Sequence, residues 1–161
     1  MMKLLSGGLA IFAGIVSFPV VGSPHAEQLN PAADYRHDPR YDRLKSFFAR
    51  FECPVKFYIR EFLDAADKNN LDWRLLPSLS VVESGGGKAA PHNNLFGWKS
   101  GKAQFASIAA GIQSVGYQLA HSPIYRKKSL DGVLETYNPK VSYGDRVKAV
   151  MAQIAPARSL P

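Results

Sequence analysis

Cysteine is almost absent from this chain of 161 residues, which contains only Cys53. One cysteine cannot form a disulfide within the chain, so Cys53 is left buried, free or paired with another chain. A lipid anchor would need a cysteine directly after the apolar run at the N-terminus, and Cys53 lies far downstream of that run. We therefore expect no lipid anchor and a buried thiol.

Motifs for metals and cofactors are missing as well. His37, His92 and His121 do not show the spacing of metal ligands. The sequence contains no phosphate-binding loop, no dinucleotide signature and no serine–histidine motif. We expect neither a metal nor a cofactor.

Acidic residues are outnumbered by basic ones, 13 against 20, which gives a formal net charge of +7. The basic residues are dispersed apart from one tight cluster at 126–128, and no aromatic-basic motif of nucleic-acid binding accompanies them. This charge favours anionic cell-wall polymers or membrane surfaces over nucleic acid as partners, while a solvated basic face is the alternative.

The first 26 residues have the composition of a secretory signal. Lys3 precedes an apolar run from Leu4 to Val21, and small residues follow up to Ala26. Cleavage after Ala26 would remove Lys3, lower the net charge from +7 to +6, and leave the protein periplasmic or secreted. An uncleaved membrane anchor is the alternative because the run is nearly long enough to span a bilayer, although glycines and Pro19 weaken such a helix.

Apolar residues at helical spacing predict one mainly α-helical domain at residues 39–155, after a flexible lead-in at 27–38 and before a tail at 156–161. Helices are expected at about 39–53, 54–68, 73–84, 108–122, 130–136 and 143–154, with Asp72 and Ser107 as caps. Residues 88–106 lack this periodicity. There we expect a loop with a short irregular β-hairpin that pairs 95–98 with 102–105.

Glu83 has the clearest catalytic placement. It follows Leu79 by four positions and Leu76 by seven, so its side chain should leave the third helix at the edge of the apolar face. Partial burial and the negative end of the helix dipole favour a protonated carboxyl group there. Glycoside cleavage needs such an acid to protonate the departing oxygen. An ordinary surface glutamate at a helix end is the alternative.

The sequence around Glu83 resembles a known family. Residues 71–76 lead through Leu79 and Val82 to Glu83-Ser84-Gly85, and Asn93-Asn94-Leu95-Phe96-Gly97 follows. These segments are similar to the glucosaminidase domain of bacterial autolysins, glycoside hydrolase family 73, and to its lytic transglycosylase relatives, over about residues 54–154. The resemblance implies an α+β lysozyme-like fold, in which a helical lobe and a small β-hairpin lobe flank a substrate groove, with Glu83 as the general acid.

Two tyrosines near the C-terminus also match this family. Tyr137, followed by Asn138 and Pro139, and then Tyr143 are similar to the tyrosine-bearing segment beside the family's catalytic groove. We expect Tyr137 to orient Glu83 or to contact the N-acetyl group of a sugar, with Tyr143 nearby as a substrate contact. A core tyrosine with a satisfied hydroxyl is the alternative for Tyr137. The chain departs from the hydrolase pattern here, because alanine, threonine and aspartate often follow this tyrosine.

The predicted β lobe supplies further candidate substrate contacts. Phe96 and Trp98 could stack on pyranose faces, and Asn93 or Asn94 could form hydrogen bonds with acetamido groups. For Phe96, packing that fixes the loop to the helical lobe is the alternative.

A second catalytic acid is hard to find, because no aspartate or glutamate occurs from 84 through 130. Two-carboxylate glycosidases normally place a second acid opposite the first. Asp131, Glu135 and Asp145 lie beyond the gap on predicted helices, where capping or surface placement is expected. A single-acid mechanism is therefore favoured. Either the substrate's N-acetyl group assists and water completes hydrolysis, or a muramic-acid 6-hydroxyl closes an anhydro ring.

The sequence thus predicts a monomeric enzyme that cleaves β-1,4 bonds in peptidoglycan glycan strands, with endo-β-N-acetylglucosaminidase-type hydrolysis preferred over transglycosylation. A cell-wall-binding module without efficient turnover is the competing interpretation, which the missing second acid favours. A toxin or inhibitor delivered to another cell's wall is a third.

Overall fold

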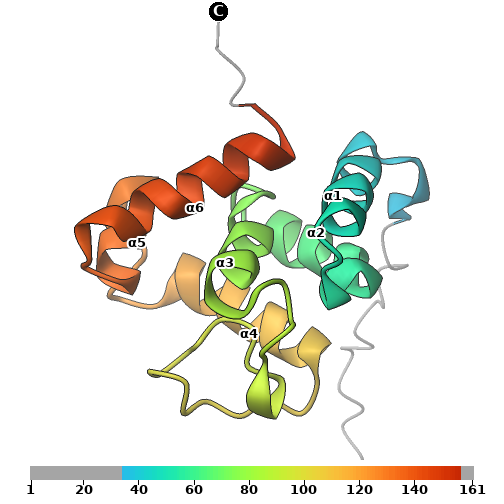
Figure 1. Cartoon of the computed structure of the whole chain (residues 1–161). Helices are drawn as coiled ribbons and strands as arrows, with labels where there is room; N and C mark the ends of the chain where they lie inside the picture. Colours follow the sequence, from blue (N-terminus) through green and yellow to red (C-terminus); the bar gives the residue numbers. More distant parts are fainter. Residues whose placement is uncertain (1–33, 157–161) are drawn as a thin grey trace, which may run out of the picture. The chain divides into compact units, whose positions relative to one another are not determined.

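Residues 34–156 are described by a computed structural model, in which they form six α-helices and no strand (Figure 1). The mainly helical class is therefore confirmed. The predicted signal at 1–26, the lead-in up to residue 33 and the tail from 157 lie outside the described residues. No helix within 34–156 is long and apolar enough to cross a membrane. The elements are η1 (Tyr35–His37), α1 (Pro39–Arg50), η2 (Pro54–Tyr58), α2 (Ile59–Lys68), α3 (Leu75–Ser84), η3 (Pro91–Asn93), α4 (Ile108–His121), α5 (Leu130–Tyr137) and α6 (Val141–Ile154), where η denotes a short 3-10 helix.

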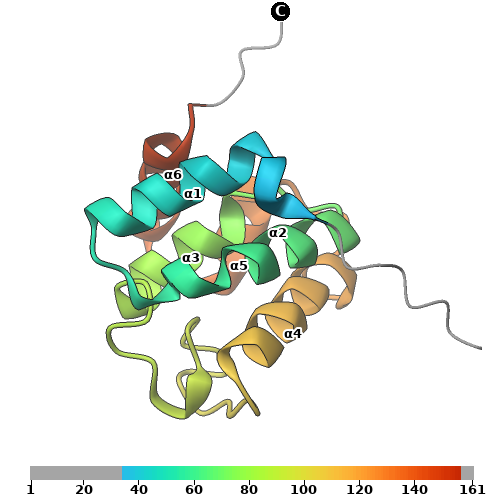
Figure 2. The same ribbon diagram turned by 90° about the vertical axis from the view of Figure 1, so that its right-hand side faces the viewer.

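Helix α3 is the centre of the fold. Every residue from Leu75 to Ser80 is buried, whereas an amphipathic surface helix would bury only one face. Helix α3 packs mainly against α6, and α2 packs mainly against α4. In both views, α6 and α4 accordingly lie on opposite sides of α2 and α3 (Figures 1 and 2). Pro77 is tolerated in α3 because it stands in the first turn, where a backbone N–H has no helical partner.

The predicted starts of the first, fourth and fifth helices are confirmed, and a short polar side chain caps each of them. Asp38 and Ser107 each accept a hydrogen bond from a backbone N–H in the first turn of α1 and α4, at 2.8 and 3.1 Å. The third helix begins later than predicted, since Asp72 closes a turn and α3 starts at Leu75. The second predicted helix is split, because 54–58 form the 3-10 helix η2 and α2 starts at Ile59. The last helix begins two positions earlier than predicted, at Val141.

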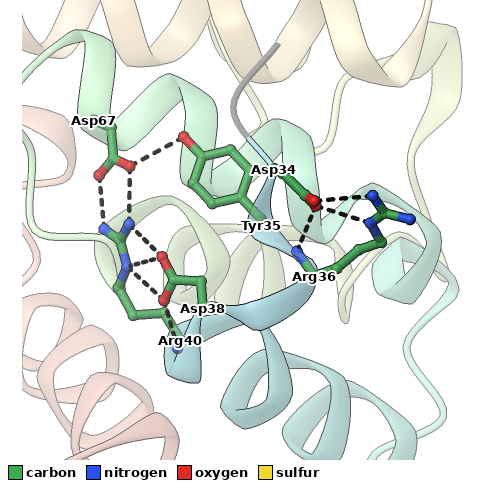
Figure 3. A network of polar contacts seen from close by, with 6 residues as sticks. All are labelled: Asp34, Tyr35, Arg36, Asp38, Arg40 and Asp67. Atoms are coloured by element: carbon green, nitrogen blue, oxygen red, sulfur yellow. Dashed lines mark hydrogen bonds and ion pairs between the residues drawn. The ribbon is translucent and has the colours of Figure 1, made fainter. Parts of the chain in front are cut away.

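A polar network ties the beginning of the described chain to α2 (Figure 3). Tyr35 is only 7% exposed, and its hydroxyl donates to Asp67 at 3.0 Å. The guanidinium of Arg40 bonds both Asp67, at 2.6 and 2.9 Å, and Asp38, at 2.7 Å, and it holds the pKa of both carboxyl groups below their usual range. The lead-in predicted to be flexible up to residue 38 is therefore part of the folded unit from Asp34 onward.

The predicted β-hairpin is not present among the described residues, and the prediction of a β lobe is wrong. Six residues between 92 and 101 have positive φ angles, from 53° to 80°, which an extended strand cannot contain. Consecutive tight turns form instead, in which Gly101 donates to the Gly97 carbonyl at 2.8 Å. Leu95 and Phe96 are adjacent yet both fully buried, which a strand with one buried face does not allow. We call residues 88–106 the cleft loop.

Cys53 is buried, as predicted, and it packs against the end of α3. Its exposed fraction is 2%, and burial raises the pKa of the thiol. Helix α3 ends at Ser84, and the φ of 63° at the next residue, Gly85, allows the N–H groups of Gly85 and Gly86 to donate back to the last turn. A side chain at Gly86 would lie 2.5 Å from the Cys53 Sγ, so only glycine fits there. The glycines after Glu83 thus fix where α3 ends and how that end packs.

Candidate active site

Glu83 lies in the last turn of α3 and is partly buried. Its Oε1 accepts a hydrogen bond from the Tyr143 hydroxyl at 2.7 Å. Its Oε2 lies against Gly97 of the cleft loop, where a Cβ atom added to the glycine would be only 2.8 Å away. One carboxyl oxygen is therefore held by α6, while the other faces a backbone that carries no side chain.

Tyr143 is the residue that orients Glu83. It lies in the first turn of α6, and its side chain is fully buried. Burial, and after it the hydrogen bond to Glu83, raises the pKa of Tyr143, so the phenol keeps its proton and acts as a donor. The sequence predicted the orienting role for Tyr137 and a substrate contact for Tyr143. In the structure, Tyr143 is the tyrosine that donates a hydrogen bond to Glu83, and its buried ring has no face open to a sugar.

Tyr137 connects α5 to the cleft loop. Its hydroxyl donates to the backbone carbonyl of Phe96, and its ring stacks on Tyr143 with centroids 5.8 Å apart and an interplanar angle of 9°. Burial, and after it the charge of Glu83, raises the pKa of Tyr137. Tyr137 also lines the neighbouring cleft. It therefore has the satisfied hydroxyl of a core tyrosine and lies beside the candidate acid as well.

A cleft of about 830 Å³ opens next to these residues. The cleft loop, α4 and the segment that follows α4 form its walls, together with Tyr137. The ring of Trp98 lies 5.7 Å from that of Tyr137 and 6.0 Å from that of Tyr125, so three neighbouring aromatic residues line the cleft. Glu83 is not itself part of the lining. It lies behind Gly97, and Gly97 lines the cleft.

Of the predicted contacts in the cleft loop, Trp98 is the one that lines the cleft. The amide of Asn94 is buried and bonds both the N–H and the carbonyl of Trp98, at 2.9 and 3.1 Å. Asn93 donates to the Phe105 carbonyl at 2.9 Å, and Phe96 is fully buried in the core. Asn93, Asn94 and Phe96 therefore shape the loop that presents Trp98.

The acids considered as a second carboxylate lie on exposed surfaces of α5 and α6. Asp131 and Asp145 both pair with Lys148, at 3.0 and 3.5 Å, and their side chains are 77% and 78% exposed. Glu135 is exposed as well. Among the described residues, Glu83 is the only carboxyl group whose charge contributes to the raised pKa values of Tyr137 and Tyr143. This part of the chain therefore presents one acid at the site.

Several residues of the site escaped the sequence analysis. Gly97 was visible as the end of the Asn93–Gly97 motif, but its approach to Glu83 depends on the fold. Nothing in the spacing of Lys99, Lys102 or Tyr125 indicated that all three line one cleft. Residues 34–156 hold no cluster of three or more side chains suited to bind a metal ion.

No protein-family model matches the chain, and no curated protein is similar enough to match it.

Proposed function

We propose that this chain is a glycosidase that cleaves β-1,4 bonds in peptidoglycan glycan strands, in the periplasm or outside the cell, with Glu83 as its acid. The observation that carries the proposal is the placement of the Glu83 carboxyl group, which Tyr143 holds at 2.7 Å behind the bare backbone of Gly97. The aromatic cleft beside Gly97 suits pyranose rings, which bind to concave sites with few, well-placed polar groups. The likeness to lysozyme-like glucosaminidases supports the same function.

In this proposal, Glu83 protonates the glycosidic oxygen while the bond between that oxygen and C1 of the sugar breaks. Because the Tyr143 phenol keeps its proton, it holds Oε1 and leaves Oε2 free to carry the transferred proton. The hydrogen bond also stabilises the carboxylate that forms when the proton leaves. Tyr143 is thus a positioning residue for the acid.

A single-acid mechanism suits these surroundings, because Asp131 and Asp145 are engaged with Lys148 on exposed surface. In hydrolysis, the carbonyl oxygen of the substrate's N-acetyl group attacks C1 as the leaving group departs, and water then opens the cyclic intermediate and gives a proton to the Glu83 carboxylate. In transglycosylation, the 6-hydroxyl of muramic acid attacks C1, forms a 1,6-anhydro ring and gives its proton to the same carboxylate. We propose endo-β-N-acetylglucosaminidase-type hydrolysis, and the single acid makes transglycosylation the second candidate.

Substitution of Glu83 by glutamine tests the proposal. The amide keeps the shape of the side chain and can still accept from Tyr143, but it has no acidic proton. We expect Glu83→Gln protein to remain folded and to lose nearly all release of fragments from purified sacculi. Glu135→Gln is the matched control, since it removes the same charge from an exposed position on α5. Retention of more than about a tenth of the wild-type turnover, a loss of only ~1.4 kcal/mol, would show that Glu83 is not the acid.

The products decide between the two reactions. Digestion in heavy-oxygen water should yield labelled reducing ends that bear N-acetylglucosamine, because hydrolysis incorporates solvent oxygen. Unlabelled fragments that end in anhydromuramic acid would replace hydrolysis by transglycosylation, with Glu83 still the acid. A wild-type protein that binds sacculi and releases nothing would be a binding module instead.

A further inference from the structure

The cleft carries positive charge that the proposed cleavage step does not use. Lys99 and Lys102 both line the cleft, and both are exposed. They lie at the two ends of one tight turn, in which the Lys102 N–H donates to the Lys99 carbonyl at 3.1 Å. Neither lysine pairs with a carboxylate of residues 34–156. The two ammonium groups are therefore available to a ligand.

No acidic side chain of the lining offsets this charge. Tyr137 is the only described lining residue outside the stretch 84–130, and that stretch contains no aspartate or glutamate. Three further cations, at 126–128, directly follow the lining residue Tyr125. A cleft lined by one sign of charge against apolar walls concentrates that charge's field. The cleft therefore favours an anionic occupant.

The turn that carries the lysines is held in a rare conformation. Lys99 and Ser100 have φ angles of 53° and 55°, in the left-handed region that residues other than glycine rarely adopt. Asn94 holds the start of this turn by bonding the Trp98 backbone at both its N–H and its carbonyl. The two lysines are thus presented from a turn whose start, at the Trp98 backbone, is held by Asn94.

We propose that Lys99 and Lys102 bind carboxylates of the glycan, so that the cleft selects anionic sugar chains over neutral ones. The inference rests on the proposed function in taking a glycan as the occupant of the cleft. In peptidoglycan, these carboxylates belong to the lactyl group of muramic acid or to the peptide attached to it. The aromatic residues beside the lysines indicate a charged group attached to a pyranose ring, which distinguishes this ligand from a phosphate polymer without ring contacts.

Calorimetric titration of Glu83→Gln protein, which leaves the ligand uncut, tests this inference. The ligands are three tetrasaccharides of the same length: the neutral N-acetylglucosamine tetramer, the alternating N-acetylglucosamine–N-acetylmuramic acid tetramer, and the latter with its peptides. We expect at least one carboxylate-bearing tetramer to bind about tenfold more tightly than the neutral one, as two partly exposed ion pairs would give. The carboxylate-bearing tetramer that binds more tightly than the neutral one identifies the source of the carboxylate, either the lactyl group or the peptide.

The added double substitution Lys99→Gln and Lys102→Gln should abolish this preference and change the affinity for the neutral tetramer by less than about twofold. Lys45→Gln with Lys56→Gln is the matched control, because it removes the same charge from exposed positions outside the cleft lining. The preference should also weaken as the salt concentration rises. An equal effect of the two double substitutions would overturn the inference and assign the preference to net charge alone.

The outcomes for the two proposals are distinguishable. Equal affinity for neutral and carboxylate-bearing tetramers, with sacculi still cleaved by wild-type protein, would overturn the carboxylate inference alone. A lysine-dependent preference without any cleavage by wild-type protein would overturn the enzymatic function and leave the carboxylate site in place. An inorganic polyphosphate that displaces the carboxylate-bearing tetramer from the cleft and binds more tightly would show that the lysines serve a phosphate polymer instead.

Discussion

A methyl group at Gly97 would collide with the Glu83 carboxyl group, which makes Gly97→Ala a direct probe of how the acid is held. The added Cβ would lie 2.8 Å from Oε2, 0.6 Å short of the 3.4 Å at which ordinary contact begins. Either the carboxyl group or the cleft loop must therefore move. Gly97 also has a φ of 58°, a left-handed conformation that disfavours alanine.

Gly101→Ala separates these two effects. Gly101 has a φ of 80°, but a Cβ there would meet nothing within 4 Å. The control therefore carries only the backbone cost, about 1 kcal/mol of unfolding free energy. Gly97→Ala carries this cost together with the loss of the hydrogen bond between Tyr143 and Glu83, roughly 1.5–3 kcal/mol for a bond to a charged group. We expect a total of about 2.5–4 kcal/mol.

Urea unfolding followed by circular dichroism, with linear extrapolation, measures these free energies. Turnover of sacculi should fall at least about tenfold in Gly97→Ala protein, because a displacement of this size in the acid costs that much. In Gly101→Ala protein, turnover should stay within about twofold of wild type. Equal losses of stability and of turnover in the two variants would refute the reasoning, since the contact with Glu83 would then have no effect beyond the shared backbone cost.

Two further substitutions test the tyrosine that orients the acid and the network at the start of the fold. Tyr143→Phe keeps the buried ring and loses only the donor to Glu83, so kcat on sacculi should fall about tenfold with KM nearly unchanged. The pKa of Tyr143 is higher in the folded state than in the unfolded state, so its contribution to stability is present below about pH 10 and is lost as the pH rises further. Tyr143→Phe protein should therefore lose less stability than wild type above about pH 10. An unchanged dependence of the unfolding free energy on pH in this range would contradict the reasoning. Arg40→Met should lower the urea midpoint at pH 7 and reduce the difference between the midpoints at pH 7 and pH 3. The lowered pKa of Asp67 gives stability above about pH 4, and this stability is lost as the pH falls through the pKa of Asp67 in the folded state. A midpoint that falls equally at both pH values would show that the ion pairs of Arg40 do not contribute.

The helical part of the fold could be predicted because its signals are local. Ser107 caps α4 through a hydrogen bond to a residue three positions later, and apolar spacing marks the buried faces of α4 and α6. The cleft loop could not be predicted in the same way. Its backbone is set by the Asn94 amide and by left-handed residues such as Lys99, and neither leaves a pattern in hydrophobicity. The apolar residues of this segment therefore suggested a hairpin that does not form.

The candidate site was predictable only in part for a related reason. Glu83 could be placed at the edge of the apolar face of one helix from its own neighbours. Its contact with Tyr143 spans 60 positions, and its contact with Gly97 depends on the turn that the cleft loop makes. Two tyrosines six positions apart gave no means of deciding which of them reaches the carboxyl group. That choice is made by the packing of α6 against α3.

Because Cys53 is buried behind the last turn of α3, its thiol is a natural chemical probe of local opening next to the candidate acid. The thiol is in contact with the backbone around Gly86, so a labelling reagent can reach it only when that region opens. Since the chain has no other cysteine, the rate of labelling reports one event. Under native conditions, this rate measures the free energy of local opening beside Glu83, separately from global unfolding. A ligand that closes the cleft over Gly97 should make these openings rarer and so lower the rate of labelling. The labelling rate would then report ligand binding without any probe attached to the protein beforehand.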